Sequence, residues 1–139
     1  MQKAEMIFDA IVGGDTEDIQ QQMEKDPSLV NAVGPDNLTP LHVAAREGNR
    51  NLVAWLIEHG ADIKAVDGRH GATPLGWAAY YGKPEPIETL LEAGADPKHR
   101  NTYGLTPYQV AEEGTEGKWE DASATSEDYH RVMDILQGR

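Results

Sequence analysis

Histidine and aspartate are the residue types in this sequence that could carry out acid–base chemistry or bind a metal ion. The chain has five histidines and no cysteine, so a metal site would need imidazole and carboxylate ligands at suitable spacing. The histidines lie in separate parts of the chain, and no two of them have that spacing. Asp96 and His99 form the nearest candidate for an acid–base pair. We therefore predict no metal site and no catalytic residues, and we expect that the protein is not an enzyme.

The glycines and the charge argue against two further classes of site. None of the 14 glycines forms a GxGxxG or GxxxxGK[ST] pattern, so no cofactor with a phosphate group is indicated. The formal net charge is −12, from 24 acidic and 12 basic residues, which disfavours nucleic acid and favours a soluble monomer. No stretch reaches the roughly 18 apolar residues of a membrane span, and no signal peptide is recognisable. We expect a cytoplasmic protein without membrane contact.

Two short phrases return at a constant period along the chain. TPLHVAA at 39–45 returns as TPLGWAA at 73–79 and as TPYQVA at 106–111, with 34 and then 33 residues between successive threonines. GAD at 60–62 returns in phase at 94–96, which gives Asp96 a place in a repeated turn rather than in a catalytic pair. The chain is therefore a repeat array.

Each copy contains the signals of two helices joined by a turn. Thr39 can cap the first helix, and Pro40 can occupy its first position, where the missing N–H is not needed. The following leucine and alanines lie at helical spacing. Gly60 stands where a second helix would end in a left-handed residue. Each unit is thus predicted to be helix, turn, helix and a protruding loop.

These phrases and their period resemble the ankyrin repeat. The resemblance implies an all-α solenoid of helix–turn–helix repeats with hairpin-like loops, and a single domain over 1–139. Its units are an N-cap repeat at about 1–37, repeats at 38–71 and 72–104, and a C-cap repeat at 105–139. The resemblance also implies that His42 ties neighbouring loops together by hydrogen bonds. Gly76 and Gln109 replace this histidine in the later repeats.

Loops and one insertion interrupt the helices. Hairpin-like loops are expected near 31–38, 64–72 and 98–105, and the second of them carries one extra residue. The last repeat has an insertion at about 114–128 that is polar and acidic, with Trp119 as its only apolar anchor. We predict a mobile loop there that contributes little to the core, unless Trp119 docks on the last repeat.

The apolar stripes predict which side chains are buried between helices. They combine the leucine and alanines of the first helix in each repeat with the aliphatic residues of the second. The predicted core residues are Leu41, Ala44, Ala45, Val53, Leu56, Ile57, Leu75, Ala78, Ala79, Ile87, Leu90, Leu91 and Ala111.

By the same resemblance, the partner-binding positions flank the glycine of each loop and follow each alanine pair. They are rich in tyrosine and arginine, the residue types that often dominate interfaces. The predicted set is Arg46, Arg69, His70, Tyr80, Tyr81, Thr102, Tyr103 and Leu105, with Trp77 beside it. The position of Trp77 is more often filled by large apolar residues for packing than for contact.

The function predicted from this set is non-enzymatic binding of a partner protein through the concave face and the loop tips. Two alternatives stay open at this point. The chain could be a regulatory or inhibitory subunit of a partner enzyme, or it could bind a small ligand or catalyse a reaction in a pocket of convergent titratable groups.

Overall fold

The computed structural model describes residues 3–119 and 122–138, with side chains from Met6 onward, and helices joined by loops make up both ranges. Met1, Gln2, Glu120, Asp121 and Arg139, which the predicted units and insertion include, lie outside the described residues. Within those ranges there is no strand, so the all-α prediction is confirmed. The helices are α1 (Lys3–Gly13), α2 (Thr16–Lys25), the 3-10 helices η1 (Pro27–Asn31) and η2 (Pro35–Asn37), α3 (Pro40–Arg46), α4 (Arg50–Glu58), α5 (Pro74–Tyr80), α6 (Pro84–Glu92), α7 (Pro107–Thr115) and α8 (Ser126–Leu136).

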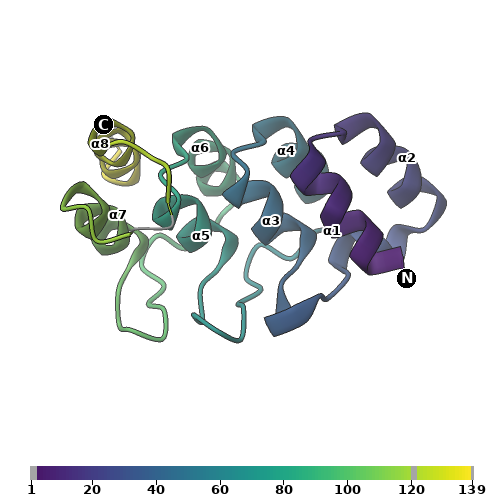
Figure 1. Ribbon diagram of the computed structural model, residues 1–139, viewed down its shortest axis with the longest axis horizontal. Helices are drawn as coiled ribbons and strands as arrows, with labels where there is room; N and C mark the ends of the chain where they lie inside the picture. The colour runs from purple at the N-terminus through teal and green to yellow at the C-terminus, as the bar shows by residue number, and fades with distance from the viewer. Residues whose placement is uncertain (1–2, 120–121, 139) are drawn as a thin grey trace.

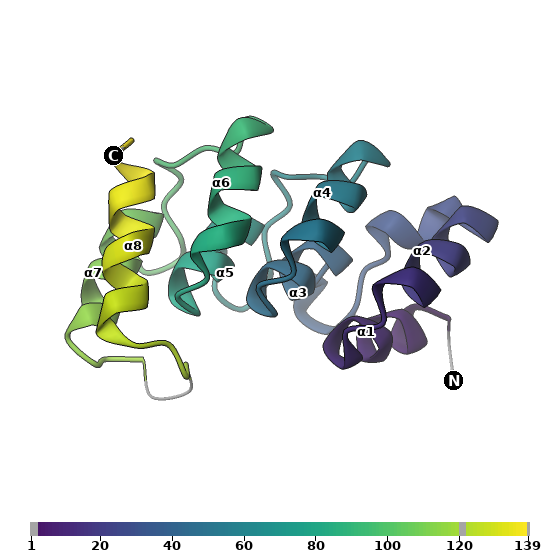
Figure 2. The same cartoon turned by 90° about the horizontal axis from the view of Figure 1, so that it is seen from above.

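The helix pairs stand in one row, and the main contacts between pairs join neighbours in the row. Figure 1 shows α3, α5 and α7 side by side in one layer, with α4, α6 and α8 in a second layer. Three long loops project from the same side of the row, beyond the first layer (Figure 1). Figure 2, seen from above, places the two ends of the chain at opposite ends of the row. This is the layout of a solenoid repeat protein.

The repeated Thr-Pro pair starts three of the first-layer helices in the same way. Thr39, Thr73 and Thr106 each have extended backbone and accept a hydrogen bond from the backbone N–H three residues later. In α3 and α7 the side chain at that third position, His42 or Gln109, also accepts from the backbone N–H of the threonine. This reciprocal capping box satisfies two donors that a helix start would otherwise leave unpaired.

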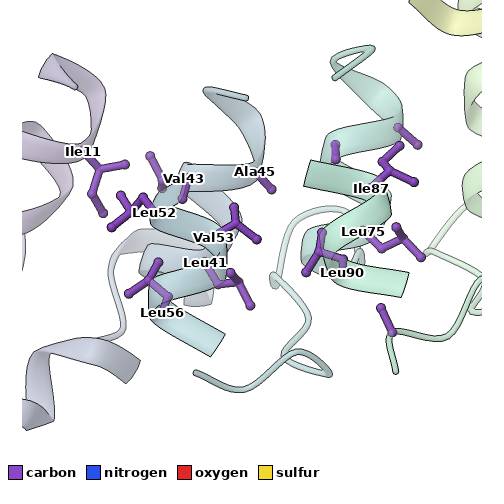
Figure 3. Packing of buried hydrophobic residues seen from close by; sticks show 14 of the residues in the cluster. Ile11, Leu41, Val43, Ala45, Leu52, Val53, Leu56, Leu75, Ile87 and Leu90 are labelled. Carbon is purple, nitrogen blue, oxygen red and sulfur yellow. The ribbon is translucent and has the colours of Figure 1, made fainter. Parts of the chain in front are cut away.

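The core runs through the whole row as one apolar cluster, part of which Figure 3 shows. The alanine pairs of α3 and α5 are fully buried, because small side chains let helices approach closely. Eleven of the predicted core residues are buried, but Ile57 and Leu91 are only partly so. Each follows an inward-facing leucine, Leu56 or Leu90, by roughly 100° around the helix and lies at the edge of its apolar face. Leu52, which is not among the predicted core residues, is also fully buried.

The insertion of the last repeat is shorter and better anchored than predicted. Helix α7 continues to Thr115 and α8 starts at Ser126, so the connection covers 116–125. Trp119 packs against the core, and its indole N–H donates to the carbonyl oxygen of Val110 at 2.8 Å. The structure thus has the alternative left open by the sequence, in which Trp119 docks on the last repeat and ties this segment to the core.

Helix α8 closes the row through Tyr129, which is 2% exposed. Its hydroxyl donates to the carbonyl oxygen of Tyr80 at 2.6 Å. Its ring lies against two glycines: a Cβ on Gly114 would come within 2.5 Å of the ring, and one on Gly82 within 3.2 Å. The close approach of the ring thus depends on the absence of a side chain at Gly114.

Candidate partner-binding surface

The three projecting loops share one backbone design, and we name them finger 1 (31–38), finger 2 (64–72) and finger 3 (98–105). In finger 1 the N–H of Gly34 donates to the carbonyl of Leu38 at 2.8 Å. The equivalent bond in finger 3 joins Asn101 to Leu105 at 3.0 Å. In finger 2 the equivalent bond joins Asp67 to Ala72. It spans one more residue than in the other fingers, because the extra residue of this loop lies inside the closed turn.

The fingers are also joined to one another, so that they form a continuous edge. The N–H of Gly68 donates to the carbonyl of Asp36 at 2.6 Å, which joins finger 2 to finger 1. The N–H of Thr102 donates to the carbonyl of His70 at 2.8 Å, which joins finger 3 to finger 2. Side chains presented on adjacent fingers are therefore held at fixed spacing.

His42 connects the helix layer to finger 2, as the resemblance predicted. Its buried ring accepts the N–H of Thr39 at Nδ1 and donates from Nε2 to the carbonyl of Ala72, 2.9 Å away. Burial lowers the pKa of the imidazole below its ordinary value of 6.5, and this outweighs the opposing effect of the bond to Ala72. The ring is therefore neutral and acts as a structural tie.

His99 was missed as a second tie to the same finger. Its Nε2 lies 3.0 Å from the carbonyl oxygen of Gly71, the residue before Ala72. Helix α5 offers no equivalent of His42, because Gly76 stands at that position. His99 lies outside the repeated helix phrase, and one period earlier its place is held by Ala65, so the repeat pattern gave no signal for this tie.

Asp67 is the polar centre of finger 2 and is 1% exposed. Its carboxylate accepts the backbone N–H groups of His70 and Ala72 at 2.8 and 2.9 Å, and the indole N–H of Trp77 at 3.1 Å. Burial alone would raise the pKa of this carboxyl, but the three hydrogen bonds outweigh it and hold the pKa below 3.8. Trp77, which is 9% exposed, thus supports finger 2 from within.

The tips of fingers 2 and 3 bring four of the predicted contact residues together. Tyr103 is 63% exposed, and its hydroxyl oxygen lies 3.4 Å from Nδ1 of His70. Thr102 and Arg69 are exposed beside them, whereas Leu105 is half-buried at the base of finger 3.

A second group of predicted residues meets at the end of α5. The rings of Tyr80 and Tyr81 contact edge to face with centroids 4.8 Å apart, and Tyr81 also lies 5.9 Å from Trp77. Trp119 joins this group from the insertion, and the centroid of its ring lies 4.8 Å from the ring centroid of Tyr80. We name these four residues the aromatic cluster. Arg46 lies outside it, at the end of α3, where its Nε donates to Glu47 at 3.0 Å.

The described ranges hold neither a metal centre nor a spanning helix. Among residues 3–119 and 122–138, no three His, Asp or Glu side chains come together in a way that could hold a metal ion. No helix in the same ranges has both the length and the apolar character needed to cross a membrane. His42 is buried, whereas His59 and His130 bond to carbonyls of their own helices.

A row of helix pairs with tied, protruding fingers defines a solenoid repeat protein. The family described as "Ankyrin repeats (3 copies)" matches residues 7–101. The chain belongs to the ankyrin repeat family, whose repeats are generally modules for protein–protein interaction.

Three relatives show how this unit occurs inside larger proteins. Ankyrin repeat and SAM domain-containing protein 6 of Rattus norvegicus is 38% identical over 104 residues, which cover 75% of this chain and 12% of that protein. Palmitoyltransferase Hip14 of Drosophila melanogaster is 38% identical over 77 residues, covering 55% and 12%. Diacylglycerol kinase iota of Homo sapiens is 29% identical over 109 residues, covering 77% and 10%. The chain thus spans a small part of each relative.

Proposed function

We propose that this protein reversibly binds a partner protein through the tips of fingers 2 and 3 together with the aromatic cluster. The observation that carries the proposal is Tyr103, a large amphipathic side chain that is 63% exposed on a finger fixed to its neighbour. Tyrosine gives much contact area for little loss of conformational freedom. Arg69 and His70 beside it add a charge and a hydrogen-bonding ring.

The position of Trp119 refines the expected contacts. Because Trp119 lies over Tyr80, we propose that a partner meets Tyr81 and Trp119 at the rim of the aromatic cluster, with Tyr80 between them. Trp77 and Leu105 hold these groups in place more than they touch the partner. Arg46 is a peripheral contact, and its pairing with Glu47 would have to be exchanged on binding.

Binding without catalysis is the activity we propose for this chain. The enzyme names among the relatives belong to proteins of which this chain matches 12% or less. A monomer in the cytoplasm is compatible with a sequence that has no cysteine and a net charge of −12. The same charge supports a protein partner over a nucleic acid.

The test is capture of the partner with the intact protein, followed by affinity measurements on matched variants. Tyr103→Ala and Tyr81→Ala should each weaken the complex about tenfold or more, as expected of central aromatic contacts. Glu88→Ala, an exposed position on α6, is the control and should leave affinity unchanged. Thermal unfolding verifies that all three variants fold. A complex that survives both tyrosine changes but is lost in Glu88→Ala would place the partner on the second helix layer.

A further inference from the structure

A groove between fingers 1 and 2 is not used by the surface described above. It has a volume of about 480 Å³ and is lined by Val33, Ala65 and Val66 together with the polar residues Asn31, Asn37, Thr39 and Asp62. Val33 is 61% exposed and Val66 is 43% exposed. Two exposed aliphatic side chains that line one groove leave apolar surface that a partner's side chain could cover.

The repeat period shows what replaces these valines on the next finger. Val33, Val66 and Arg100 each precede the residue whose N–H closes its finger, so they occupy one equivalent position. Two residues earlier, the equivalent positions hold Asn31, Lys64 and Lys98. The edge therefore changes from apolar at fingers 1 and 2 to cationic at fingers 2 and 3.

The positive charge of this edge is concentrated and ordered. Fingers 2 and 3 contain four Lys or Arg residues and a single carboxylate, Asp67, in a chain with a net charge of −12. That carboxylate is buried and already accepts three hydrogen bonds. The guanidinium of Arg100 donates to the carbonyl of Gly104 at 2.8 Å, which holds this side chain against its own finger.

One carboxylate lies in each of the turns that come directly before fingers 2 and 3. Asp62 borders the groove and accepts the N–H of Lys64 at 2.9 Å. Asp96 accepts the N–H of Lys98 in the same turn of the next repeat, also at 2.9 Å. Both carboxylates come before their fingers in the sequence. Fingers 2 and 3 themselves, from Lys64 and Lys98 onward, therefore keep an excess of cations.

We propose that this edge binds an extended acidic segment of a partner protein. One apolar side chain of the segment enters the groove between Val33 and Val66, and its carboxylates face Lys64, Lys98 and Arg100. Complementary charge would speed encounter, and burial of the apolar side chain would slow dissociation. This inference rests on the proposed function and names the chemistry of the partner.

A selection of random 12-residue peptides displayed on phage tests this proposal with the intact protein as bait. The enriched peptides should combine at least one large apolar residue with several Asp or Glu residues. The best synthetic peptide, labelled with fluorescein, is then titrated against the protein by fluorescence polarisation at low and at physiological ionic strength. Added salt should weaken binding, because the ion pairs on this edge are exposed to solvent.

Matched variants assign the binding to the edge. Val33→Ser with Val66→Ser, and separately Lys98→Glu with Arg100→Glu, should each weaken the peptide about tenfold. Arg50→Glu on α4 with Arg131→Glu on α8 makes the same change of net charge at exposed positions of the second helix layer and should leave affinity unchanged. Thermal unfolding of every variant separates lost binding from lost folding.

The outcomes distinguish this inference from the proposed function. Loss of the captured partner in Tyr103→Ala, with no effect of either edge variant on partner or peptide, would overturn the inference and leave the proposed function standing. Loss in the edge variants alone would support the inference and remove the finger tips and aromatic cluster as the main contact. The acidic-segment proposal would be overturned if the selection enriched basic peptides or enriched no peptide. It would also be overturned if the protein bound vesicles containing phosphatidylserine in place of peptides.

Discussion

Finger 2 and finger 3 have the same backbone closure but are stabilised by different chemistry. Asp67 in finger 2 and Asn101 in finger 3 occupy equivalent positions, and each accepts two backbone N–H groups of its own finger. Asp67 is buried, charged and also bonded to Trp77, whereas Asn101 is neutral and half-buried. A finger can thus be fixed either by the helix layer or mainly by its own side chains.

The difference extends to the histidines. Finger 2 receives His42 from α3 at the carbonyl of Ala72 and His99 from finger 3 at the carbonyl of Gly71. The helix position that would serve finger 3 is Gly76, which has no side chain to contribute. Finger 2 is therefore expected to be the most resistant part of the edge, and finger 3 the part that opens first.

Replacement of Asp67 should have the largest effect on stability. Asp67→Ala leaves the indole N–H of Trp77 and two backbone N–H groups without their acceptor in a buried place, which should cost about 3 kcal/mol. Urea unfolding measures it. Asp67→Asn is the sharper comparison, because it installs the side chain of finger 3, and it should recover only part of the loss. A loss as small as that of Asn101→Ala would contradict the distinction between the fingers.

His42→Ala should be the next most damaging change. It removes a fully buried side chain with bonds at both ring nitrogens and should lower the free energy of unfolding by about 2 kcal/mol. Hydrogen exchange should also show faster opening of finger 2. His59→Ala, on the exposed end of α4, is the matched control and should change stability little.

Acid should destabilise the protein through His42 before it does so through Asp67. The folded-state pKa of His42 lies below its unfolded value of 6.5, so its contribution is complete above that pH and is lost as the pH falls below it. The loss can reach about 1.4 kcal/mol per pH unit between the two pKa values. The carboxyl of Asp67, with its pKa held below 3.8, loses its contribution only below that pH. Urea titrations across this range should show a shallower decline for His42→Gln, and equal slopes would refute the assignment.

Asn101→Ala should have the smallest effect of these changes. It removes bonds to the N–H groups of Tyr103 and Leu105, but finger 3 is accessible to water, which can replace them. The expected cost is about 0.5–1 kcal/mol. Tyr103 should become more mobile, which nuclear magnetic resonance relaxation would detect, and a loss matching that of Asp67→Ala would contradict the comparison.

The fold could be predicted from the sequence because its signals are local and repeated. Thr-Pro caps and alanine pairs specify each helix within a few residues, and the period places the helices in order. The docking of Trp119, the tie from His99 and the bond from Tyr129 to Tyr80 depend on residues 9, 28 and 49 positions apart. These depend on loop paths that no single phrase encodes. The finger positions could be located by the period, but the exposed valines of the groove gave no signal, because aliphatic residues usually indicate a core.

The close contact between Tyr129 and Gly114 sets the boundary of the recognition surface. Gly114 occupies, one period later, the place of Tyr81, and the ring of Tyr129 fills the space where a side chain would stand. A larger residue at this point would collide with the closing helix, so the last repeat cannot extend the aromatic cluster. An array lengthened by engineering would have to gain its new repeat before Thr106, since the final unit is shaped as an end piece and cannot be copied into the interior.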